Sequence, residues 1–95
     1  MFRGSIVALV TPMGEAGEVD FTAFEALLER HAGQGTDGVV VAGATGEAAA
    51  LTAAETGELL QRAVGRLGGR VPVIAATGTS STATTVERTR AACEL

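Results

Sequence analysis

Three apolar runs recur along this sequence at nearly equal distances, and their spacing limits the possible folds more than any other feature. The runs begin at residues 6, 38 and 71, which are 32 and then 33 residues apart, and they lead into the threonines Thr11, Thr45 and Thr77. A period of this length is typical of strand–helix–strand units with parallel strands. We therefore predict an α/β protein built from three consecutive strand–helix (βα) units.

The strands are predicted from the β-branched residues that dominate these runs. Because proline has no backbone N–H, Pro12 should stop strand pairing after the first run, and Pro72 fits only near the start of the third. The predicted strands are Ile6–Val10, Gly38–Ala42 and Val71–Ala76.

Helix-capping residues mark the segments that follow the strands. Asp20 is a good N-cap for a helix that runs to about His31. Thr52 and Glu55 have the spacing of a capping box at the start of a second helix. This second helix is predicted to bury Leu59, Leu60, Ala63, Val64 and Leu67.

A third helix is predicted to begin at Ser80 or Ser81, although its many threonines lower its intrinsic helix propensity. Its single thiol, Cys93, is expected to be a small apolar packing residue. Its buried face should carry Ala83, Val86 and Ala92.

Three βα units alone would leave open sheet edges and uncovered strand faces. Eight units of this spacing give roughly 260 residues, the usual size of a closed (β/α)₈ barrel. We therefore expect residues 1–95 to be the amino-terminal part of a single TIM-barrel domain, comprising its first three βα units and incomplete as it stands. The alternative is a truncated fragment without catalytic activity.

The composition argues against several classes of function. A net charge of −4 gives no basic patch for nucleic acid, and no segment resembles a membrane span or a signal peptide. One cysteine excludes an internal disulfide and fits a reducing compartment, so we expect a cytoplasmic protein that binds neither nucleic acid nor membrane.

His31 lies on an apolar helix face with no second histidine, and we expect no metal site. All seven basic residues are arginines, so these 95 residues cannot complete a reaction that needs a side-chain amine.

The turn after the second run is the candidate ligand site: Gly43-Ala44-Thr45-Gly46-Glu47. Ligands of α/β folds bind at the carboxyl ends of the strands. Glycines there let the backbone approach a ligand closely. The N–H groups of Ala44, Thr45 and Gly46, together with the Thr45 hydroxyl, can converge on a carboxylate or phosphate. The alternative role for Thr45 is to serve only the hydrogen bonds of the turn. A dinucleotide site is the weaker alternative, because no acidic residue follows the next predicted strand.

Several motifs in order resemble the dihydrodipicolinate synthase and N-acetylneuraminate lyase family of pyruvate-dependent class I aldolases. The second position of the glycine turn is the one departure from the family's loop pattern, G-[T/S]-T-G-E. The resemblance extends over all 95 residues and is carried by Gly4–Met13, Val19-Asp20, Gly35–Gly38, Gly43–Glu47, Val71–Ala75 and Thr77-Gly78.

The resemblance implies a TIM-barrel enzyme in which a lysine from a later strand forms a Schiff base with pyruvate. The resulting carbon nucleophile attacks an aldehyde, which in the synthases belongs to aspartate semialdehyde, on the route to lysine. It also implies a homotetramer that needs no cofactor. The Thr45 hydroxyl and the backbone amides of Ala44 and Thr45 would hold the pyruvate carboxylate.

Two departures bear on the reaction and its control. The synthases place a threonine of a proton relay at position 44, where Ala44 has no hydroxyl, so N-acetylneuraminate lyase or a 2-keto-3-deoxy sugar-acid aldolase or dehydratase is the alternative. Lysine-inhibited synthases carry histidines, an asparagine and a carboxylate among their effector positions, so lysine inhibition is expected to be absent. Those positions here are Ala49, Ala53, Thr56, Ser80 and Thr84.

Overall fold

The computed structural model describes residues 4–43, 46, 51–78 and 81–94. Its order is β1 (Ile6–Ala8), α1 (Phe21–Gly33), β2 (Gly38–Val41), α2 (Ala53–Leu67), β3 (Val73–Ala75) and α3 (Thr82–Cys93). The three strands form one parallel sheet in the order β1-β2-β3. The predicted sequence of three βα units is therefore confirmed.

Each strand is shorter than predicted, although the hydrogen bonding continues past its end. The Leu9 N–H donates to the Val40 carbonyl at 3.0 Å, and the Ala76 N–H donates to the Val41 carbonyl at 3.1 Å. Pro72 lies directly before β3, as predicted. Beyond β1 and β3, the chain thus stays bonded to the middle strand for one more hydrogen bond before it enters the following loop.

The predicted helix starts are confirmed by their capping contacts. The Asp20 carboxylate accepts a hydrogen bond from the Ala23 N–H at 2.9 Å. At α2, the Thr52 hydroxyl accepts from the Glu55 N–H at 3.1 Å, and the Glu55 carboxylate accepts from the Thr52 N–H at 2.8 Å. Ser81 caps α3 by accepting from the N–H of Thr84. These helices begin where they do because side chains next to them satisfy N–H groups that the first turn leaves free.

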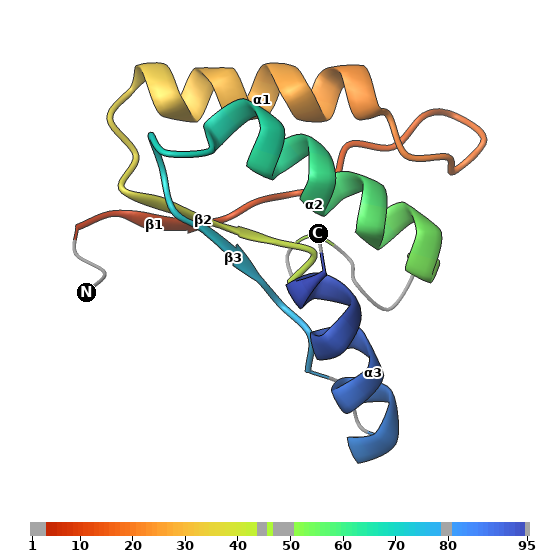
Figure 1. Ribbon diagram of the computed structural model, residues 1–95. Coiled ribbons are helices and arrows are strands. Elements are labelled where there is room, and N and C mark those ends of the chain that lie inside the picture. Colours follow the sequence, from red (N-terminus) through yellow and green to blue (C-terminus); the bar gives the residue numbers. More distant parts are fainter. Residues whose placement is uncertain (1–3, 44–45, 47–50, 79–80, 95) are drawn as a thin grey trace.

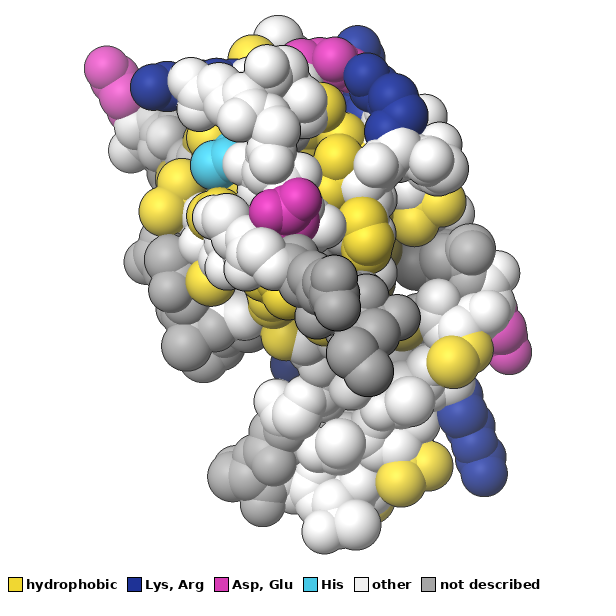
Figure 2. All heavy atoms as spheres, turned by 90° about the vertical axis from the view of Figure 1, so that its left-hand side faces the viewer, with side chains coloured by type: hydrophobic (Ala, Val, Ile, Leu, Met, Phe, Trp, Pro, Cys, Tyr) yellow, Lys and Arg dark blue, Asp and Glu magenta, His cyan; other side chains and the backbone are white. Residues whose placement is uncertain are grey.

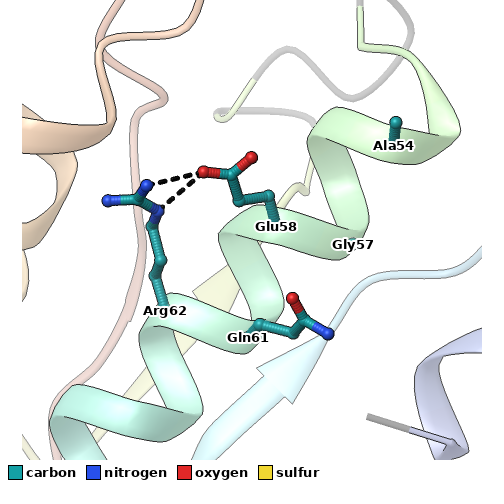
Figure 3. Close-up of a pocket in the computed structure, with 5 residues that line it drawn as sticks. All are labelled: Ala54, Gly57, Glu58, Gln61 and Arg62. Atoms are coloured by element: carbon teal, nitrogen blue, oxygen red, sulfur yellow. Dashed lines mark hydrogen bonds and ion pairs between the residues drawn. The ribbon is translucent and has the colours of Figure 1, made fainter.

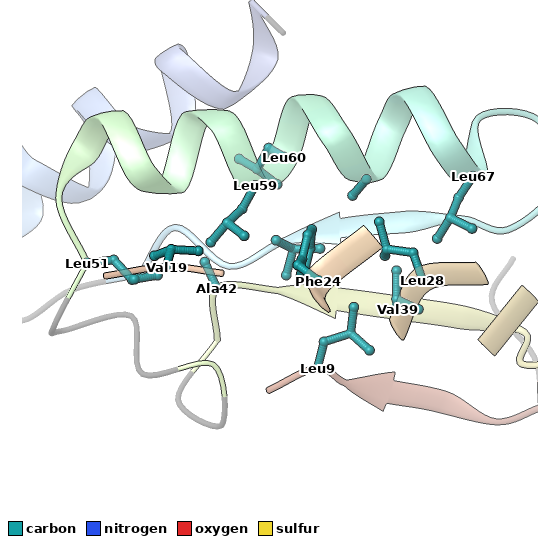
Figure 4. Close-up of a cluster of buried hydrophobic side chains, with 12 residues drawn as sticks. Leu9, Val19, Phe24, Leu28, Val39, Ala42, Leu51, Leu59, Leu60 and Leu67 are labelled. Atoms are coloured by element: carbon teal, nitrogen blue, oxygen red, sulfur yellow. The ribbon is translucent and has the colours of Figure 1, made fainter. Parts of the chain in front are cut away.

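Helices α1 and α2 lie together on one face of the sheet, whereas α3 runs away from this layer beyond the end of β3 (Figure 1). Between the two helices and the sheet lies one apolar core, which Figure 4 shows from the side. Phe24 and Leu28 point into it from α1, and Leu59 and Leu67 from α2. The side chain of Val39 meets them from the middle strand, and all five residues are at most 1% exposed.

The opposite face of the sheet is not covered by any described helix. Successive side chains of a strand alternate between the two faces. Leu9 is buried under the helices, while its neighbour Val10 is 53% exposed and Ile6 is 40% exposed. The sheet thus presents apolar side chains on the side that faces away from α1 and α2.

Four residues that were predicted to pack against other elements are exposed. Leu60 marks one edge of the buried stripe of α2. Val64 lies four residues later, which is slightly more than one helical turn, so it falls outside that stripe and is 46% exposed. On α3, Val86 is 44% exposed and Ala83 is also exposed, since within the described chain α3 packs only along the side that contains Ala92. Cys93 is exposed as well, and is therefore not a packing residue in this structure.

Ion pairs join α1 to α2 on the outer side of the core. The carboxylate of Glu25 lies 3.5 Å from Arg62 and 3.4 Å from Arg66, and that of Glu29 lies 3.3 Å from Arg70. All of these side chains remain partly exposed, so each pair contributes only a few tenths to about 1 kcal/mol. Their effect is to favour one register between the two helices.

Candidate functional site

The strands are parallel, so their carboxyl ends meet at one edge of the sheet, and the polar residues that follow them gather there. Thr11 follows β1, Gly43 and Gly46 follow β2, and Thr77 follows β3. This edge is where α/β folds hold ligands. The structure therefore brings three of the sequence-predicted turns to the same edge.

Thr11 connects the end of β1 to the loop after β2. Its hydroxyl donates a hydrogen bond to the Gly46 carbonyl at 2.6 Å, across 35 residues of sequence. Thr11 is only 5% exposed, and Gly46 is also buried. A hydrogen bond that is shielded from water holds its partners more firmly than an exposed one. The loop after β2 is therefore fixed at this point to the first strand.

Gly46 approaches the end of β1 so closely that no larger residue fits without a shift. A Cβ atom at this position would lie 2.9 Å from the Thr11 hydroxyl oxygen and 3.0 Å from the Leu9 carbonyl oxygen. The sequence interpretation assigned this glycine to close approach of a ligand. Its packing against β1 supplies a second physical reason for glycine here.

Ala42 begins the same loop with an unusual backbone conformation. Its φ is +57°, in the left-handed region that glycine adopts without strain and alanine adopts at a cost of about 1–2 kcal/mol. The residue is 2% exposed, so its methyl group is held in the core while the chain turns into Gly43. Strain of this kind gathers at functional sites. Nothing in the sequence indicated it.

Thr77 at the end of β3 is directed towards α3. Its hydroxyl oxygen lies 2.9 Å from that of Thr89, which donates in turn to the Thr85 carbonyl at 2.8 Å. Thr77 also lines a narrow, mostly apolar groove between α2 and α3. Its hydrogen bond therefore ties the third strand to the helix that follows it.

The residues predicted to hold a carboxylate, Ala44 and Thr45, lie outside the described part of the chain, and so does Glu47. The glycines on either side of that pair, Gly43 and Gly46, are described. The contacts above thus define the two ends of the predicted cradle, while its central pair stays a prediction.

Two of the effector positions face the groove between α2 and α3. Ala53 and Thr56 line it, together with Leu60, Ala76 and Ala92. Arg88 is the one charged residue along this groove among the residues that the structure describes. Thr84 lies in the first turn of α3, and Ala49 and Ser80 fall outside the described residues.

His31 lies near the opposite, amino-terminal end of the sheet, where Figure 2 shows the one histidine of the chain in cyan at the surface. Its Nδ1 atom is 2.9 Å from the Thr36 hydroxyl oxygen, and the residue is half-buried. This contact makes it a boundary histidine that ties the end of α1 to the strand that follows. Among the described residues, no cluster of histidine, cysteine and carboxylate side chains has the arrangement of a metal site.

A shallow hollow lies on the outer surface of α2, bordered by Ala54, Gly57, Glu58, Gln61 and Arg62 (Figure 3). Its charged groups already pair with each other, because Arg62 Nη2 lies 2.6 Å from Glu58 Oε2. The Arg62 guanidinium also stacks 4.7 Å above the centre of the Phe21 ring. Both charged side chains that the structure describes at this hollow are therefore already paired, which argues against a substrate site here.

None of the described helices combines the length and the apolar character that crossing a membrane requires.

Comparisons with known proteins agree on one family. The model of the dihydrodipicolinate synthetase family matches residues 1–95. A 4-hydroxy-tetrahydrodipicolinate synthase of Coxiella burnetii is 44% identical over 95 residues, which are the whole of this chain and 33% of that protein. This chain spans about a third of the length of the curated relatives that it matches.

Solved structures give the same result. The dihydrodipicolinate synthase of Acinetobacter baumannii, solved in complex with pyruvate, superimposes with a TM-score of 0.96 at 41% identity, over 99% of this chain and 32% of that one. The N-acetylneuraminate lyase of Mycoplasma synoviae gives a TM-score of 0.88 at 28% identity, over 98% of this chain and 33% of that one. From the family match over all its residues and these structural likenesses, we conclude that the chain belongs to the dihydrodipicolinate synthetase family.

Proposed function

We propose that these 95 residues supply the part of a Schiff-base enzyme that binds the carboxylate of pyruvate. The observation that carries this proposal is the buried hydrogen bond from Thr11 to Gly46, which fixes the glycine loop at the carboxyl edge of the sheet. In TIM barrels this edge holds the active site. A relative of this chain has been solved with pyruvate, which is the anion that the loop suits.

The barrel itself is part of the proposal: residues 1–95 form the first three of eight βα units within a single domain. The uncovered sheet face carries the exposed side chains of Ile6 and Val10, as the inward face of an incomplete barrel would. The outer strands β1 and β3 each have one unpaired edge within the described sheet. Five further units would cover that face and pair both edges, in keeping with relatives about three times as long.

In the proposed reaction, the lysine amine of a later strand condenses with the pyruvate ketone and releases water. The iminium withdraws electrons, so that the pyruvate methyl group loses a proton and the resulting carbon attacks an aldehyde. The Thr45 hydroxyl and the Ala44 and Thr45 amides would hold the carboxylate throughout. Aspartate semialdehyde is the proposed aldehyde, which makes the activity that of a 4-hydroxy-tetrahydrodipicolinate synthase in lysine biosynthesis.

A second candidate rests on Ala44. Without a hydroxyl there, the chain fits N-acetylneuraminate lyase or a 2-keto-3-deoxy sugar-acid aldolase or dehydratase, which also act through a pyruvate Schiff base. We further propose a cytoplasmic homotetramer. Because the small side chains of Ala53, Thr56 and Thr84 have no charge to pair with an ammonium group, we also propose that lysine does not inhibit the enzyme.

Trapping of pyruvate with borohydride tests the proposal. We define the barrel chimera as residues 1–95 followed by the remaining two thirds of the Acinetobacter baumannii synthase. Reduction in the presence of pyruvate should attach one pyruvate to a lysine beyond residue 95 of the chimera. The 95 residues alone contain no lysine, so they should form no adduct at any side chain.

The remaining two thirds of the synthase, without residues 1–95, serve as the control and should give no specific adduct. A folded chimera that cannot be trapped would show that this chain does not complete a pyruvate site. A stable pyruvate adduct at a side chain of the isolated 95 residues would overturn the proposed division of the site.

A further inference from the structure

We propose that Thr11 is a positioning residue for pyruvate, acting through Gly46 on the loop that holds the carboxylate. This inference rests on the proposed function. Thr11 follows β1, whereas the glycine loop follows β2. In this proposal Thr11 contacts the loop and does not contact the substrate. Its role is to set where the donors at positions 44 and 45 stand relative to the rest of the site.

The loop is held at both of its described ends, and the two ends are held by different means. At its start, Ala42 has a left-handed backbone and is buried in the core, and it leads directly into Gly43. At its end, Gly46 packs against β1 and accepts the hydrogen bond from Thr11. Only Ala44 and Thr45 separate these two points in the sequence.

Among the residues that the structure describes, one side-chain donor makes the contact at the second end. The Thr11 hydroxyl lies 2.6 Å from the Gly46 carbonyl oxygen, and no other side-chain donor among the described residues reaches that oxygen. Water has little access, because Thr11 is 5% exposed and Gly46 is buried. Removing the hydroxyl therefore takes away the one side-chain donor that the described residues give this buried carbonyl, and we expect the segment to move to regain a partner.

A shift at Gly46 passes to Thr45, the residue directly before it, whose hydroxyl and amide belong to the proposed cradle. Donors that bind an anion lose strength steeply when distance or angle departs from the ideal. The expected consequence is weaker binding of pyruvate with little change in later chemical steps, since the lysine lies elsewhere. A raised KM for pyruvate with a nearly unchanged kcat differs from the loss of active enzyme that a general loss of stability would cause.

The test compares Thr11→Val, Thr11→Ala and Thr11→Ser in the barrel chimera. Valine and alanine both remove the hydroxyl, and valine alone keeps the volume of the side chain. Each of these two variants should raise the KM for pyruvate about tenfold, while kcat changes less than about threefold. Serine keeps the donor and should restore the KM to within about twofold. The matched control is Thr36→Val, which removes a hydroxyl that pairs with His31 at the other end of the sheet and should leave the KM unchanged.

Melting temperatures of all variants should be measured beside the kinetics, with assays run where each variant is folded. An unchanged pyruvate KM in both Thr11→Val and Thr11→Ala would overturn the positioning role. An equal rise in Thr36→Val would overturn it too, because the effect would then follow general stability. Borohydride trapping of the unmodified chimera distinguishes failure of the positioning role from failure of the proposed function. If pyruvate can be trapped, the chimera contains the pyruvate site, and an unchanged KM then contradicts only the role of Thr11.

Discussion

Replacing Ala44 by threonine in the barrel chimera is expected to raise turnover with aspartate semialdehyde about 10²–10⁴-fold, the usual contribution of a positioned acid–base group. The threonine would supply the hydroxyl that the synthases use at this place in their proton relay. The KM for pyruvate should stay nearly unchanged, because the proposed cradle uses only the backbone of residue 44. Steady-state kinetics with both substrates measure the two quantities separately.

Ala44→Val is the matched control, since valine has nearly the shape of threonine without the hydroxyl. It should give no gain in turnover. If Ala44→Thr leaves turnover with aspartate semialdehyde unchanged or lowers it, the synthase assignment is contradicted. Activity of the unmodified chimera towards N-acetylneuraminate or a 2-keto-3-deoxy sugar acid would then support the second candidate function.

Replacing Phe24 by alanine is expected to lower the free energy of unfolding by about 3–5 kcal/mol. The ring is 1% exposed and lies in the core between α1, α2 and the sheet, so its removal leaves a cavity that the surrounding helices cannot easily close (Figure 4). The midpoint of denaturant unfolding of the chimera, followed by circular dichroism, measures the change.

Val86→Ala provides the comparison on α3, where the side chain is 44% exposed. It should change the free energy of unfolding by less than about 0.5 kcal/mol, as surface substitutions do. Equal effects of the two substitutions would contradict the arrangement in which α1 and α2 form the core and α3 lies outside it.

The elements of this fold were predictable because their signals are local. Asp20 and Thr52 cap helices through residues three positions away, so the sequence alone locates those helix starts. The exposure of Val86 was not predictable in the same way, because an apolar residue at helical spacing indicates a buried face only if another element covers it. The pairing of Glu29 with Arg70 likewise depends on how two helices lie side by side.

The candidate site, too, was predictable only where its features depend on neighbouring residues in the sequence. The glycine turn after β2 was evident from sequence because glycines and polar residues follow an apolar run. Two features of it were not: the left-handed backbone of Ala42, which a sequence would assign to glycine, and the partner of Thr11, which lies 35 residues away. The threonine after β1 was recognised as a polar strand end, but only the parallel pairing of β1 with β2 brings it to Gly46.

The central claim is that the loop after β2 holds the carboxylate of pyruvate, and its most direct test is the affinity for pyruvate of the chimera carrying Thr45→Val. Valine keeps the volume but removes the hydroxyl donor. A hydrogen bond to a charged group is worth roughly 1.5–3 kcal/mol, so the pyruvate concentration for half-maximal borohydride trapping should rise about 10–100-fold. An unchanged trapping curve in a folded Thr45→Val chimera would contradict the claim.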